Sequence, residues 1–171
     1  MKIHSVKFNF IMNFIMAASS IVFPLITFPY VSRVLMAAGN GKVATASAVI
    51  TYFNMFASLG IPTYGIRACA KVRDDRDKLS QTVQELLIIN SVTMLITCAA
   101  FVFTVALVPE FAAEKELYVI NGIGMVLNMF AITWLYNALE QYAYITVCNL
   151  LVKLVSLVLM LLMVKSPDDY I

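Results

Sequence analysis

Charged residues are scarce in this chain. Only 13% of its 171 residues are charged, whereas 61% are hydrophobic. A soluble domain usually carries about 25% charged residues, and one of roughly 150 residues still exposes about a third of its unfolded surface. A water-soluble fold could not hide so much apolar side chain. The composition therefore excludes an ordinary soluble domain and predicts a membrane protein.

Residues that carry catalytic or metal chemistry are also few. His4 is the only histidine, and Cys69, Cys98 and Cys148 form no CxxC pair. The sequence therefore offers neither a histidine-based metal site nor a disulfide framework, and the three thiols are predicted to be small packing residues. The chain contains no GxSxG, Walker or HExxH motif and no basic patch of nucleic-acid-binding type. We expect no enzyme, no cofactor and no nucleic-acid partner.

Long apolar runs make up most of the sequence. A membrane-spanning helix needs about 20 predominantly apolar residues, and no run alternates with period two as barrel strands do. The chain is predicted to be an all-α membrane protein with five transmembrane helices, over residues 8–31, 43–66, 83–108, 117–139 and 142–164.

Lysine and arginine predict the orientation of these helices. With the N-terminus inside, the inner segments hold seven basic residues and the outer segments four. Cytoplasmic loops carry the excess of Lys and Arg, so the N-terminus and residues 67–80 are predicted to face the cytoplasm. The inner residues are Lys2, Lys7, Arg67, Lys71, Arg73, Arg76 and Lys78, and the outer ones are Arg33, Lys42, Lys115 and Lys165.

The charged segment 67–80 has eight charged side chains in twelve positions and predicts an interfacial helix on the inner leaflet. The string "TVQE" (82–85) matches a capping box and predicts the start of the third helix there. Pro62 inside the second apolar run predicts a kink in that helix.

Polar residues inside the apolar runs are the candidates for function. Lys153 lies about eleven residues, or roughly 16 Å, from either end of the fifth run, too far for its stem to reach an interface. Its charge belongs either in a wet cavity or in an ion pair with Glu85 or Glu140. Arg33 and Arg67, near helix ends, either reach the headgroups or bind a substrate. The asparagines either join helices or line a polar path: Asn9, Asn13, Asn54, Asn90, Asn121, Asn128 and Asn149.

Several strings of the sequence resemble a known family. Four strings are similar to the N-terminal part of bacterial polysaccharide-export flippases: "FPYVSRVL" (28–35), "YFNMFASLGIPTYGIRACAKVRDD" (52–75), "KLSQTVQELLIIN" (78–90) and "WLYNALEQYAYIT" (134–146). These are the O-antigen and capsule repeat-unit flippases of the multidrug/oligosaccharidyl-lipid/polysaccharide superfamily. The resemblance covers nearly the whole chain.

The resemblance implies a two-lobed transporter of twelve or more helices around a central cavity. The five helices would form most of the N-terminal lobe, with the C-terminal lobe missing from this chain. Such proteins flip an undecaprenyl-diphosphate-linked oligosaccharide across the cytoplasmic membrane by alternating access. Arg33, Arg67 and Lys153 match cationic positions expected to bind the diphosphate.

Two other functions stay open from the sequence. A drug or cation antiporter of the same superfold would need carboxylates within its spans, and Glu85 and Glu140 lie only at helix ends. A non-transporting, truncated remnant is the other alternative.

Overall fold

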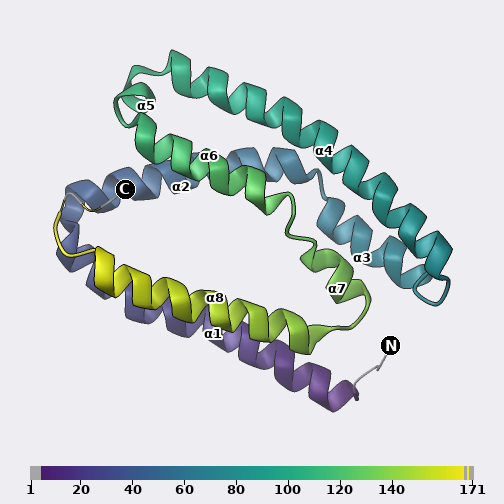
Figure 1. Ribbon diagram of the computed structural model, residues 1–171. Helices are drawn as coiled ribbons and strands as arrows, with labels where there is room; N and C mark the ends of the chain where they lie inside the picture. The colour runs from purple at the N-terminus through teal and green to yellow at the C-terminus, as the bar shows by residue number, and fades with distance from the viewer. Residues whose placement is uncertain (1–4, 168, 170–171) are drawn as a thin grey trace. The chain divides into compact units, whose positions relative to one another are not determined.

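The computed structural model describes residues 5–167 and 169, and its regular elements in that part of the chain are all helices (Figure 1). Five helical segments are long and apolar enough to cross a membrane, which confirms the predicted fold class. The helices are α1 (Val6–Val34), α2 (Met36–Ser58), α3 (Ile61–Lys71), α4 (Arg76–Leu107), α5 (Pro109–Ala113), α6 (Lys115–Asn128), α7 (Thr133–Ala138) and α8 (Tyr142–Met163).

The chain forms two compact units. The first unit contains α1, the start of α2 up to Lys42, and α8. The second unit is Val43–Ala138, which contains the rest of α2 and α3 to α7.

In the first unit, α1 and α8 lie side by side along their length (Figure 1). Thr146 Oγ1 donates to the Met12 carbonyl at 3.1 Å, and Tyr30 OH donates to the Val164 carbonyl at 2.8 Å. Both pairs are 134 residues apart in the sequence. A constant offset over five helical turns means that the two helices run parallel and in register. The first and fifth spans of a membrane protein cross in the same direction, so this arrangement fits five spans.

The second unit is built from interrupted helices. The second apolar run, predicted as one kinked helix, breaks at Leu59 and Gly60, where φ is 41° and 73°. Gly60 tolerates this left-handed conformation because it lacks a Cβ. Pro62 lies in the first turn of α3, where its missing N–H costs nothing, so it starts a helix and does not kink one. The fourth run is likewise divided into α6 and α7.

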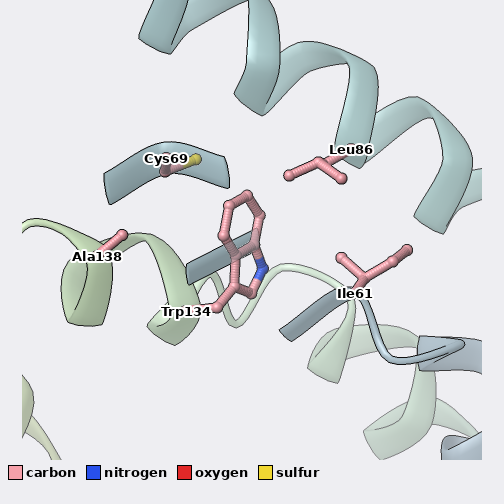
Figure 2. Close-up of a cluster of buried hydrophobic side chains, with 5 residues drawn as sticks. All are labelled: Ile61, Cys69, Leu86, Trp134 and Ala138. Atoms are coloured by element: carbon pink, nitrogen blue, oxygen red, sulfur yellow. The ribbon is translucent and has the colours of Figure 1, made fainter. Parts of the chain in front are cut away.

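Trp134 is the centre of the core of the second unit. Figure 2 shows its indole ring among Ile61, Cys69, Leu86 and Ala138, which come from α3, α4 and α7. The ring lies so close to α3 that a Cβ built on Gly65 would be 2.6 Å from Trp134 Cε3. Cys69 is fully buried here, as expected of a packing residue.

Two local predictions around the charged segment are wrong. Residues 72–75 form a turn, so residues 67–80 are not one interfacial helix. Asp75 caps α4 instead: its side chain accepts from the Lys78 amide, and its carboxylate lies 2.9 Å from Lys78 Nζ. Aspartate competes with the helix by bonding nearby backbone amides, which favours a cap at this point.

The predicted capping box at residues 82–85 therefore lies inside α4. Thr82 Oγ1 donates to the Lys78 carbonyl, and Glu85 accepts from Gln81 Nε2 at 3.1 Å. The first loop is also shorter than predicted, because α2 begins at Met36, directly after the Leu35 cap of α1.

Candidate functional site

Lys153 lies on α8 and points its ammonium group at α1. Its Nζ donates to Ser19 Oγ at 2.8 Å and to Ser20 Oγ at 3.0 Å. It also lies 5.8 Å from the centre of the Phe23 ring, within the range of a cation–π contact. The pair Ser19–Lys153 has the same offset of 134 residues as the two other interhelical hydrogen bonds. The parallel register of α1 and α8 is therefore what brings the lysine to the serines.

The local structure of α1 prepares the two serine hydroxyls to accept from a lysine. Ser19 Oγ and Ser20 Oγ each donate back to the Met16 carbonyl, at 2.7 and 3.0 Å. Since a hydroxyl has one donor, the oxygen lone pairs are left for Lys153. Pro24 follows in the next turn and has no N–H, so the Ser20 carbonyl loses its usual helical donor.

A groove of about 500 Å³ runs beside this cluster between α1 and α8. Its polar groups are Lys153 and the hydroxyl-bearing Ser20, Thr27 and Ser156, and its remaining walls are apolar. Two of the three ammonium hydrogens of Lys153 are used by the serines. The third is available to a further acceptor, so the groove can bind an anionic group by a charge-assisted hydrogen bond.

The other two predicted cations do not lie in this groove. Arg33 is exposed in the last turn of α1, thirteen residues beyond Ser20, which is roughly 20 Å along the helix. Arg67 is exposed on α3 in the second unit. The polar partners of Lys153 in the part of the chain that the structure describes are the two hydroxyls of Ser19 and Ser20.

Sequence reasoning identified Lys153 but missed Ser19 and Ser20. The only local signal was the pair of hydroxyl residues in the middle of an apolar run, "AASS" at 17–20. Serine is common in spanning helices because its hydroxyl bonds the backbone of its own helix. The signal became specific only when the register of α1 and α8 was known.

Comparison with known proteins gives the family of the chain. The family model described as "Polysaccharide biosynthesis protein" matches residues 6–171. The chain belongs to this family. The resemblance seen in the sequence strings is thereby confirmed at the level of the family, and the chain is a multi-pass membrane protein of polysaccharide biosynthesis.

Two curated relatives carry the same printed name, "Putative O-antigen transporter". The one from Escherichia coli (strain K12) is 25% identical over 165 residues, and the one from Shigella dysenteriae is 24% identical over 165 residues. Each match covers 96% of this chain but only 40% and 41% of the relatives, so the chain spans about two fifths of their length. No solved structure matches the chain.

Proposed function

We propose that this polysaccharide biosynthesis protein works in the flipping of a lipid-linked oligosaccharide across the cytoplasmic membrane. The lipid is an undecaprenyl diphosphate, and the movement is alternating access. Membership of the family and the names of the two O-antigen relatives support the export of a polysaccharide. The observation that carries the proposal is the mid-span ammonium of Lys153, held by neutral hydroxyls beside a groove.

The chemistry of the substrate explains why such a lysine is useful. A diphosphate with a polar glycan cannot cross about 30 Å of hydrocarbon unaided. A lysine at this depth costs at least about 2.5–3.5 kcal/mol on insertion scales. A phosphate oxygen on the third ammonium hydrogen would offset that cost by neutralising the charge. The hydroxyls hold the lysine in place without neutralising it, so it stays attractive to an anion.

Further contacts are part of the same proposal. Arg33 and Arg67 serve as additional cationic contacts for the diphosphate during its passage. The partners are membrane lipids, the lipid-linked oligosaccharide, and a C-terminal lobe that completes the cavity.

Export measured in cells tests the role of Lys153. Lys153→Met keeps most of the side-chain volume but removes the charge, and it should reduce surface polysaccharide at least tenfold with normal protein level. Lys153→Arg should retain part of the activity, because the charge survives although its donors point differently. Lys165→Met is the matched control, since Lys165 follows α8 and is exposed, and it should export normally.

Normal export by Lys153→Met would contradict the proposal. If Lys153→Ala protein is degraded and Glu140→Ala restores its level, the lysine belongs to a structural ion pair, and the diphosphate contact is wrong.

The proposed orientation has its own test. Single cysteines at Ser80 and Ala112, in a protein without the three native thiols, should react from opposite sides of the membrane. Ser80→Cys should be protected from an impermeant reagent applied outside intact cells, and Ala112→Cys should be labelled. Labelling of Ser80→Cys under these conditions would reverse the orientation.

A further inference from the structure

The second unit contains a small polar pocket where its two interrupted helices meet. The pocket has a volume of about 90 Å³. Its lining includes Asn54 and Ser58 at the end of α2, Pro62 at the start of α3, Asn128 at the end of α6, and Trp134 near the start of α7. Both helix breaks therefore open onto the same space.

Three asparagines line this pocket, from α2, α4 and α6: Asn54, Asn90 and Asn128. Two other span asparagines differ, because Asn121 Nδ2 and Asn149 Nδ2 donate to carbonyls four residues earlier on their own helices. Within residues 5–167 and 169, the side chains of the three pocket asparagines have no hydrogen-bond partner. The sequence left open whether span amides join helices or line a polar path, and these three line a pocket.

The polar atoms of these three side chains are accessible and not buried, and Asn128 is exposed, so their donors and acceptors are open to water or to a ligand. The unwound backbone at the two breaks adds further polar groups. Interrupted helices at membrane depth are tolerated where they line such a cavity.

The lining points to a neutral occupant. It contains no charged side chain. The carboxyl ends of α2 and α6 and the amino ends of α3 and α7 lie at the same breaks, so partial charges of both signs offset one another. An asparagine amide both donates and accepts, which matches a hydroxyl or an acetamido group. A volume of about 90 Å³ is well below the roughly 300–1,000 Å³ of ordinary ligand pockets, so the pocket suits one group of a larger ligand.

We propose that this pocket binds neutral hydroxyl or acetamido groups of the glycan, through Asn54, Asn90 and Asn128. The choice of a glycan as the ligand rests on the proposed function. The pocket is separate from the Lys153 groove and differs from it in chemistry, since it selects a neutral polar group and the groove selects an anion.

The only tryptophan in the sequence provides a probe, because Trp134 forms part of the pocket lining. Tryptophan emission of the protein purified in detergent would be titrated with N-acetylglucosamine, which carries hydroxyl and acetamido groups. We expect a saturable change with weak, millimolar affinity. Asn90→Leu should weaken it at least tenfold, and Asn128→Leu, at an exposed position, should do the same with less risk to folding. Asn121→Leu is the matched control and should bind like the unchanged protein.

Three results would overturn the proposal. The first is the absence of any saturable change, which leaves water as the occupant. The second is an equal response in correctly folded Asn90→Leu and Asn128→Leu proteins. The third is a saturable response to sodium chloride that the sugar does not produce, which makes the pocket a cation site. Lys153→Met should bind N-acetylglucosamine like the unchanged protein. Loss of export in Lys153→Met therefore tests the groove, and loss of sugar binding in the asparagine variants tests this pocket.

Discussion

The two units of this protein accommodate polar groups within their spans in different ways. In the first unit, α1 and α8 are unbroken parallel helices joined by side-chain hydrogen bonds, and their one mid-span charge is held by hydroxyls. In the second unit, helices are interrupted, and uncharged amides surround the interruptions. Hydrophobic burial adds little between helices in lipid, so packing and hydrogen bonds decide both arrangements.

The two arrangements correspond to the two kinds of ligand that we propose. In the first unit, the proposed anion contact depends on one charged side chain, Lys153. In the second unit, the pocket at the helix breaks is lined by uncharged asparagines, which suits a neutral ligand. In the two proposals above, the first unit binds the anionic part of a lipid-linked oligosaccharide and the second unit binds its neutral part.

The largest expected effect comes from overpacking the core of the second unit. Gly65→Val adds three carbons where the first would already be 2.6 Å from Trp134 Cε3, and it should destabilise the protein by about 2–3 kcal/mol. Gly124→Val is the control, because nothing lies within 4 Å of a Cβ there. Thermal unfolding in detergent measures both variants. Equal midpoints would mean that the Trp134 ring moves freely and the core is not rigid.

A smaller effect should follow from removing one hydroxyl in the first unit. Ser19 is 7% exposed, whereas Ser20 is exposed, although both accept from Lys153. Ser19→Ala should cost about 1–1.5 kcal/mol, because the loss occurs in a drier environment, and Ser20→Ala about 0.5 kcal/mol. Their unfolding midpoints should fall in that order. The reverse order would mean that the exposed hydroxyl is the main anchor of the lysine.

The smallest effect concerns the exposed cap of α4. The pKa of Asp75 is lowered below its ordinary value of 3.8, mainly by a hydrogen bond from the Lys78 side chain and secondly by one from the Lys78 backbone amide. The cap therefore contributes its full stabilisation above the ordinary pKa of 3.8. This stabilisation is lost as the pH falls through the lowered pKa of the folded protein. The Lys78 amide resonance should therefore titrate with a midpoint below pH 3.8. Asp75→Asn should abolish this titration and Asp74→Asn should leave it; a midpoint at or above 3.8 would contradict the cap.

The sequence alone predicts the class of the protein, the number of spans and the depth of Lys153 within its span. These follow from local quantities: the apolar content of a run, the rise of about 1.5 Å per residue, and the depth of a charge within a run. The ends of α1, α4 and α8 lie within a few residues of the predicted runs, apart from the start of α4, where Asp75 provides an earlier cap. Family membership was also visible in short strings of residues.

Only the tertiary structure decided which residues meet. Lys153 donates to Ser19 because α1 and α8 are parallel and residues 134 apart in the sequence lie side by side. No local sequence pattern specifies this offset. Asn54, Asn90 and Asn128 resemble Asn121 and Asn149 in sequence, and they differ because the fold brings them to one pocket, Asn90 from the unbroken helix α4. The break before α3 has local causes in Gly60 and Pro62, whereas no glycine or proline lies in the break between α6 and α7. Rotation and register of helices are properties of their contacts, and contacts exist only in the folded chain.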